Sequence, residues 1–267
     1  MLQMDFHLNT TGFSLAGNHE LYNLSRNDLC KKLQIPFTLE ATGDLVGYFS
    51  HQIHSQTYAE TKETDKSMTC VQKKLRFLVL DSYDICVLDR CPKESHKYRQ
   101  AHDILSANNH NYPQNENSPD GLEGLSKRFV AFGGGIDIPQ LEWFEKSLQS
   151  AKENGERVIV VSHQPIHPGS SWPTCLMWNY LEVLSIMRRN KEVIIASFSG
   201  HAHKGGYVRD DSGIHFRTLE AVLESPDPIR TYGICDLWDD KLVIRGSGDC
   251  VSDVYDLDHL TAYHENI

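Results

Sequence analysis

The sequence has few of the features that would place a chain in a membrane or in a secretory compartment. Its longest apolar runs, Val158 to Val161 and Val193 to Phe198, are far shorter than the roughly 20 residues that a membrane-spanning helix requires. Residues 1–12 lack the basic start and the long apolar stretch of a signal peptide. We therefore expect a soluble, cytoplasmic protein with no membrane partner.

Excess positive charge is also missing. The chain carries 26 Lys and Arg against 36 Asp and Glu, which gives a formal net charge of −10. A protein that grips nucleic acid without sequence preference needs a basic face, so we exclude nucleic acid as a partner. A small anionic substrate is not excluded, because a bound metal ion can supply local positive charge.

Cysteine pairing is the third absence. The seven cysteines include no C-x-x-C pair, and their number is odd. Without an export signal they predict no disulfide framework, and we interpret them as thiols in a reducing compartment.

Apolar patterning predicts an α/β fold. Buried strands are expected at 75–80, 157–162 and 191–199. Amphipathic helices at 139–154 and 178–189 would separate these strands. Alternation of strands and helices favours a sheet that contains parallel pairs.

The pattern changes after Gly200. Residues 213–222 alternate as a strand does, and 232–238 with 241–245 predict a hairpin. Together they indicate a β-meander in a second sheet. Of two polar stretches, 57–74 and 95–126, we expect the second to be a loop or lid.

Three histidine-bearing clusters follow predicted strands: Gly17–Glu20, Ser162–Pro165 and Gly200–His203. Loops at the carboxyl ends of strands converge on one edge of an α/β sheet, so these clusters can meet in space. Imidazole nitrogens suit manganese, iron and zinc, and an Asn oxygen is a plausible harder ligand. Each cluster alone has an ordinary alternative, a helix cap, a turn or a satisfied strand end. Together they indicate a metal site.

The clusters GNHE, SHQP and GHAH resemble the motifs of the calcineurin-like metallophosphoesterases. Longer stretches, among them GNHELYNLSR, RFLVLDSYDI, VIVVSHQPIHPGS, GHAHKGGY and HFRTLEAVLE, are similar to the manganese-dependent ADP-ribose/CDP-alcohol diphosphatase branch. The resemblance runs from about Gly17 to Gly246. It implies a single domain over 1–267, with two packed mixed β-sheets flanked by helices and two divalent metal ions.

Matched motif by motif, the resemblance implies that Asn18, His163 and His201 hold one metal and that His203 binds the other. It implies that His19 acts on the phosphoryl oxygens or the leaving group as a proton donor. The expected ions are manganese, with zinc or iron as alternatives. Expected products are AMP and ribose 5-phosphate from ADP-ribose, and CMP and a phospho-alcohol from a CDP-alcohol.

The resemblance lacks one part. The family has an Asp-x-His or Asp-x-Gln strand end and a Gly-Asp motif upstream of GNHE, and neither precedes Gly17 here. Asp5-Phe6-His7 has the letters of the first motif, but it lies too close to GNHE to leave room for the intervening elements. We therefore expect an amino-terminally truncated monomeric domain, missing its first strands, with impaired activity. The alternative is a non-catalytic chain that binds nucleotide or a protein partner without turnover.

Weaker candidates surround these motifs. Lys204 and Tyr207 follow GHAH and are candidates for contacting a phosphate or substrate, with a tight turn as the alternative. Tyr22 is a candidate for stacking on a nucleobase, as are Trp178 and Tyr180, with core packing as the alternative. Residues 133–135, three glycines without the rest of a P-loop, are interpreted as a flexible turn.

Overall fold

The structure is a computed structural model that describes residues 2–4, 12–60, 68–88, 92–226 and 230–261. Asp5-Phe6-His7 lies outside the described residues. Within them, none of the helices has the length and apolar character needed to cross a membrane.

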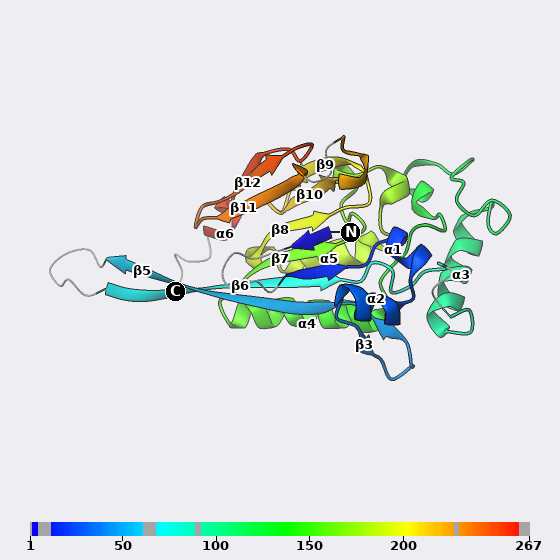
Figure 1. The fold of residues 1–267 in the computed structure, drawn as a ribbon, viewed down its shortest axis with the longest axis horizontal. Helices are drawn as coiled ribbons and strands as arrows, with labels where there is room; N and C mark the ends of the chain where they lie inside the picture. The colour runs from blue at the N-terminus through cyan, green and yellow to red at the C-terminus, as the bar shows by residue number, and fades with distance from the viewer. Residues whose placement is uncertain (1, 5–11, 61–67, 89–91, 227–229, 262–267) are drawn as a thin grey trace.

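A six-stranded sheet forms the centre of the molecule (Figure 1). Its order is β5-β6-β7-β8-β10-β9, with the three inner junctions parallel and the two outer ones antiparallel. The strands are β5 Phe49–Glu60, β6 Met68–Leu80, β7 Arg157–Ser162, β8 Ile194–Ser199, β9 Lys204–Arg209 and β10 His215–Glu220. The three predicted buried strands are confirmed, although β8 starts three residues late because Lys191–Val193 form the short 3₁₀ helix η4.

Three smaller sheets accompany it. They pair β1 Leu2–Met4 with β2 Phe13–Leu15, β3 Thr38–Leu39 with β4 Leu45–Val46, and β11 Tyr232–Leu237 with β12 Lys241–Ser247 and β13 Asp253–Asp256. The predicted hairpin is β11–β12, and it belongs to a second sheet as expected. The expectation of a second sheet was wrong for residues 213–222, because their strand β10 pairs in parallel with β8 and so extends the central sheet.

The helices include both predicted ones. The described α-helices are α1 Asn18–Asn23, α2 Arg26–Leu33, α3 His96–Asn108, α4 Ile138–Glu153, α5 Tyr180–Arg189 and α6 Asp258–Thr261, and the remaining 3₁₀ helices are η1 Gly124–Arg128, η2 Pro168–Ser170, η3 Pro173–Cys175 and η5 Val222–Glu224. Asp137 caps α4, since its carboxylate accepts a hydrogen bond from the Ile138 N–H at 2.8 Å.

The central sheet is covered on both faces. Leu78 and Leu80 of β6 pack with apolar side chains of α4 and α5. Phe77 and Val79 point the other way and pack with β2, β12 and β13. This alternation is the period of two that a strand imposes, and it produces the expected arrangement of packed sheets with flanking helices.

The polar stretch 95–126 is only partly irregular, so the expectation of a loop was wrong for its first half. Helix α3 begins after Ser95, whose hydroxyl accepts from the Tyr98 N–H at 3.1 Å. Ala101 and Leu105, four residues apart, are both fully buried. The buried side chains of Ala101 and Leu105 and the Ser95 cap therefore stabilise this helix. It was not predicted because the stretch as a whole is polar.

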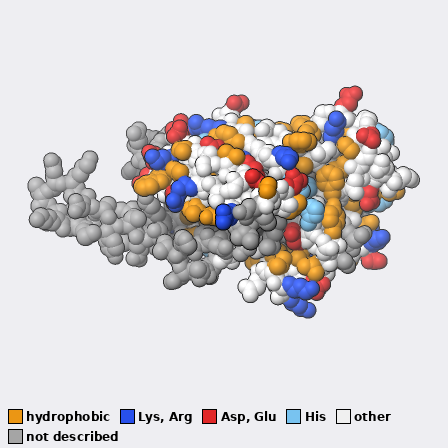
Figure 2. All heavy atoms as spheres, turned by 45° about the horizontal axis from the view of Figure 1, so that its top comes forward, with side chains coloured by type: hydrophobic (Ala, Val, Ile, Leu, Met, Phe, Trp, Pro, Cys, Tyr) orange, Lys and Arg blue, Asp and Glu red, His pale blue; other side chains and the backbone are white. Residues whose placement is uncertain are grey.

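The surface carries mixed charge. On the face drawn in Figure 2, basic and acidic side chains are interspersed, and neither sign forms a broad field. The described residues on this face form no extended basic patch of the kind that tracks a nucleic-acid backbone.

Candidate metal centre

Three loops bring the predicted ligands to one place. Asn18 begins α1 directly after β2, His163 follows β7, and His201 follows β8. Strands β7 and β8 are parallel neighbours, so their carboxyl ends lie side by side. The central sheet therefore unites His163 and His201, whereas Asn18, 183 positions before His201, comes from β2, which pairs with β1 in a separate sheet.

The side chains of these residues form a triangle of donor atoms. His163 Nε2 lies 3.1 Å from Asn18 Oδ1 and 3.2 Å from His201 Nδ1, and the third side of the triangle, His201 Nδ1 to Asn18 Oδ1, is 3.2 Å. Asn18 and His163 are buried at 6% and 7% exposure. We call Asn18, His163 and His201 the triangle.

The triangle fits a divalent metal. Bonds of about 2.1 Å at right angles hold neighbouring ligand atoms about 3.0 Å apart, close to the spacing of these three atoms. Two imidazoles and an amide oxygen are donors that manganese, iron and zinc accept. The opposite ring nitrogens, His163 Nδ1 and His201 Nε2, are buried without a hydrogen-bond partner among the described residues. If His163 Nε2 and His201 Nδ1 bind a metal ion, each neutral ring carries its proton on this opposite nitrogen.

Electrostatics keep both histidines neutral. Burial lowers the pKa of His163 well below its usual value, and the neighbouring His201 adds to the effect. Burial, followed by the charges of His203 and His19, lowers the pKa of His201 to about 3. Because only an unprotonated nitrogen can ligate a metal, these shifts preserve the ligand form of both rings at neutral pH.

Two backbone features concern residues of the motifs GNHE and GHAH. A Cβ atom on Gly17 would lie 2.4 Å from His163 Cε1, so a glycine is needed where α1 meets the imidazole. His201 adopts a left-handed backbone with φ of 66°, a conformation that few non-glycine residues take. Such strain concentrates at functional sites.

Two aromatic rings that were not predicted from the sequence, those of Tyr83 and Phe132, lie beside the triangle. The fully buried Tyr83 ring lies 5.8 Å from the His163 ring and 6.5 Å from the His201 ring. Phe132 lies 5.7 Å from His201, and its carbonyl accepts a hydrogen bond from the Tyr83 hydroxyl at 3.3 Å. Tyr83 belongs to RFLVLDSYDI, one of the stretches that resemble the diphosphatase branch. That resemblance is the sequence feature that could have indicated Tyr83 as a site residue.

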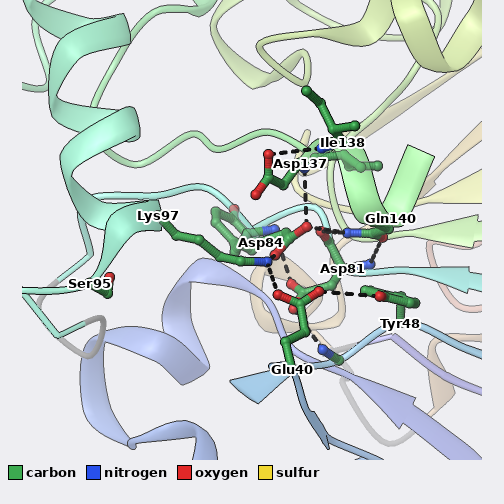
Figure 3. A network of polar contacts seen from close by, with 12 residues as sticks. Glu40, Tyr48, Asp81, Asp84, Ser95, Lys97, Asp137, Ile138 and Gln140 are labelled. Atoms are coloured by element: carbon green, nitrogen blue, oxygen red, sulfur yellow. Dashed lines mark hydrogen bonds and ion pairs between the residues drawn. The ribbon is translucent and has the colours of Figure 1, made fainter. Parts of the chain in front are cut away.

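A network of charged and polar side chains lies at the end of β6 (Figure 3). Lys97 of α3 pairs with Asp84 and, at 2.9 Å, with Glu40. Asp84 also accepts from Gln140 at 2.9 Å. Asp81 accepts from the Tyr83 N–H at 3.1 Å, so the turn that carries the Tyr83 ring is fixed by this network.

Burial and the nearby Asp81 raise the pKa of Asp84 to about 6, against the opposing effect of Lys97. Burial opposes the charge of Lys97, but Asp84 raises the pKa of Lys97 overall. At neutral pH the pair is therefore ionised.

The remaining candidates form a row along the rim of the triangle. The Tyr22 ring lies 5.9 Å from the His19 ring, which lies 6.0 Å from the His203 ring. Glu224 of η5 bonds His203 Nδ1 at 2.6 Å and pairs with Lys204 at 3.2 Å. We call these five residues the rim row. Glu224, the hydrogen-bond partner of His203, was not anticipated from the sequence.

Other predicted residues lie elsewhere. The Tyr207 ring stacks on Tyr255 at 4.9 Å, and its hydroxyl bonds His215 at 2.9 Å. Trp178 and Tyr180 are buried at 2% and 7% exposure, so the alternative of core packing is confirmed for both.

The triple glycine is no flexible turn. A Cβ on any of Gly133–Gly135 would meet a close atom: Trp178 Nε1 at 2.6 Å, the Ser82 carbonyl at 2.6 Å or Asn179 Oδ1 at 2.9 Å, respectively. Tight packing on every side, rather than conformational freedom, explains these three glycines.

The described residues contain no group of three or more His, Cys, Asp or Glu side chains that could hold a metal ion. The Asn18 amide is therefore what completes the triangle as a donor set.

Comparison with known proteins agrees with the motifs. The chain is 38% identical over 236 residues to the manganese-dependent ADP-ribose/CDP-alcohol diphosphatase of Xenopus tropicalis, covering 87% of this chain and 65% of that protein. It is 34% identical over 250 residues to the protein of the same name from Homo sapiens, covering 93% of this chain and 68% of that protein. This chain belongs to that family. No protein-family model matches the sequence.

The fold of the chain is similar to that of a dimetal phosphatase. A crystal structure of a dimetal phosphatase from Danio rerio superimposes with a TM-score of 0.74 at 32% identity, covering 91% of this chain and 71% of that one. The chain thus spans 65% of the length of the Xenopus relative and somewhat more of the others named here.

Proposed function

We propose that this chain hydrolyses the pyrophosphate bond of ADP-ribose and CDP-alcohols with the help of divalent metal, manganese foremost. The single observation that carries the proposal is the triangle, three converging neutral donor atoms 3.1–3.2 Å apart. The names of the relatives support the substrate class and the metal.

The charge of the site suits such a substrate. Asn18, His163 and His201 contribute no negative charge when both rings are neutral. A divalent ion bound there would supply positive charge for the oxygens of a phosphoryl group. Because the donors do not cancel that charge, a pyrophosphate anion is the natural counterpart despite the overall acidic composition.

The protein's own residues have separate tasks in this proposal. Asn18, His163 and His201 would hold the ion and thereby orient the phosphoryl group. In the reaction, the water oxygen bonds to phosphorus and the bridging P–O bond breaks. His19, the residue after Asn18, would give a proton from its ring to the leaving oxygen, a contribution of about 10²–10⁴ in rate. Tyr22, which contacts His19 and is 40% exposed, is free to stack on a base.

Turnover of ADP-ribose tests the proposal. The purified chain with Mn²⁺ should release AMP and ribose 5-phosphate, measured by chromatography, and His163→Ala should reduce the rate at least 100-fold. His102→Ala, a change to a histidine on α3 outside the site, is the matched control. Equal rates in the wild type and His163→Ala would contradict the proposal.

A second candidate function is nucleotide binding without turnover. It is favoured by the absence, over the described ranges, of a histidine- and carboxylate-rich metal cluster beside the triangle, and by the engagement of His203 with Glu224. Metal content separates the two functions: two equivalents of metal with AMP release favour the enzyme. Binding of ADP-ribose without AMP release favours the second candidate.

Zinc or iron as the ion, a second bound ion, a cytoplasmic location and a monomeric state stay predictions. So do the roles in substrate binding of Lys204 and Tyr207. Of these two, Lys204 lies in the rim row and Tyr207 packs against Tyr255.

A further inference from the structure

Glu224 makes a contact that the proposed function does not use. Its Oε1 accepts a hydrogen bond from His203 Nδ1 at 2.6 Å, and its Oε2 lies 3.2 Å from Lys204 Nζ. The carboxylate thus lies between the Lys204 ammonium and one specific nitrogen of the imidazole.

The contact decides which tautomer His203 adopts. A carboxylate can only accept a hydrogen bond, so Nδ1 must carry the proton. In a neutral imidazole the other nitrogen, Nε2, then keeps its lone pair. A histidine without such a partner divides itself between two tautomers, and only one of them offers Nε2 as a ligand.

The backbone holds this partner in place. The Ala221 N–H donates to the His203 carbonyl at 3.0 Å, and the Glu224 N–H donates to the Ala221 carbonyl at 3.2 Å. The loop after β8 and the 3₁₀ helix η5 after β10 are thus joined by main chain as well as by side chain. The pair is partly exposed, so its effect would be on orientation more than on stability.

We propose that Glu224 is a positioning residue that fixes His203 in its Nδ1–H tautomer and leaves Nε2 available to a metal ion or a phosphoryl oxygen. The role in metal binding rests on the proposed function, whereas the tautomer assignment stands on the contact alone. Carboxylates that hold a ligand histidine in this way typically change metal affinity by about 10–100-fold when removed.

The experiment compares the wild-type chain with Glu224→Ala. Histidine is labelled with ¹⁵N, and the ring tautomer of His203 is determined by NMR in the metal-free chain at pH 8, with the signals assigned through His203→Gln. Mn²⁺ alone is then added, and the concentration that broadens the His203 signals is measured. Glu153→Ala, which removes an exposed carboxylate at the end of α4 that precedes β7, is the matched control.

We expect a single Nδ1–H tautomer in the wild type and in Glu153→Ala, and a mixture in Glu224→Ala with an unchanged unfolding midpoint. The Mn²⁺ concentration needed for broadening should rise about 10–100-fold in Glu224→Ala alone. A mixed tautomer in the wild type, or an unchanged one in Glu224→Ala, overturns the proposal. Wild-type signals that Mn²⁺ leaves sharp contradict the proposed metal function instead, while the tautomer comparison still decides the role of Glu224.

Discussion

Two buried polar clusters meet at Tyr83, and they are built in opposite ways. The network around Lys97 and Asp84 consists of charged groups that satisfy one another. The triangle consists of neutral groups, and its two outer ring nitrogens have no partner in the part of the chain that the structure describes. The first cluster is held together by paired charges, whereas the second directs three uncharged donor atoms toward one point. Converging neutral donors of this kind mark a metal-binding site better than a set of paired buried charges does.

The largest effect is expected where the charged network is broken. Lys97→Met leaves the buried Asp84 without its cation and should lower the free energy of unfolding by about 3–5 kcal/mol, measured by urea denaturation. Lys146→Met, which removes an exposed ion pair with Glu142, should change it by less than about 1 kcal/mol. Comparable losses in the two variants would show that the network does not differ from surface charge.

Breaking the triangle should affect binding more than folding. His163→Asn removes one of three donors, and the affinity for Mn²⁺ should fall about 100-fold or more, since even indirect partners of a metal account for 10–100-fold. Its metal-free stability should decrease by less than that of Lys97→Met. Titration calorimetry with Mn²⁺ measures the first quantity and urea denaturation the second. An unchanged affinity would remove the triangle from the metal site.

A smaller effect should follow from displacing His163 without removing it. In Gly17→Ala the new methyl group overlaps the imidazole, so we expect a loss of about 10-fold in Mn²⁺ affinity and about 1–3 kcal/mol in stability. Gly200→Ala is the matched control, because its nearest neighbour, His163 Nδ1, would lie at 3.8 Å, an ordinary contact. If both variants bind Mn²⁺ equally, the position of the His163 ring is not critical.

The smallest effect is a dependence of stability on pH. The pKa of His201 is about 3 in the folded chain against 6.5 as its ordinary value, so the unfolded chain binds the extra proton between these pH values. Stability from His201 is therefore complete above pH 6.5 and is lost as the pH falls, by at most about 1.4 kcal/mol per unit. Asp84, whose raised pKa of about 6 acts in the opposite direction, partly offsets this loss.

His201→Asn isolates the contribution, since Asn tolerates the left-handed backbone. Urea denaturation at pH 7 and pH 5 in the presence of a chelator should show a larger loss in the wild type than in His201→Asn. Equal losses would mean that His201 is not held neutral by its surroundings.

The sequence predicted what depends on local pattern. Val158–Val161 is an apolar run that only a strand covered on both faces accommodates, and the spacing of Phe144 and Leu148 fits a single helix face. Helix α3 was not predicted because only small parts of its sequence are apolar. The positions of His163 and His201 could be predicted together because neighbouring parallel strands end at one edge. Asn18 follows β2 of a separate sheet, so its place beside them depends on how the two sheets pack.

Other parts of the site depend on contacts between distant segments. Tyr83 reaches the triangle only because Asp81 and its partners fix the preceding turn. Glu224 reaches His203 from a different strand connection, 21 positions away. Neither contact has a local signature, since a tyrosine after a strand and a glutamate in a short helix are common features.

The packing of Gly133–Gly135 has a consequence for redesign of the protein. A library that varies the length or composition of this segment should yield few folded members, because every side chain added there collides with a neighbouring segment. Phe132, the residue immediately before it, is half-buried and borders His201. Altered substrate preference is therefore better sought by exchanging the Phe132 side chain on an unchanged main chain than by remodelling the loop that carries it.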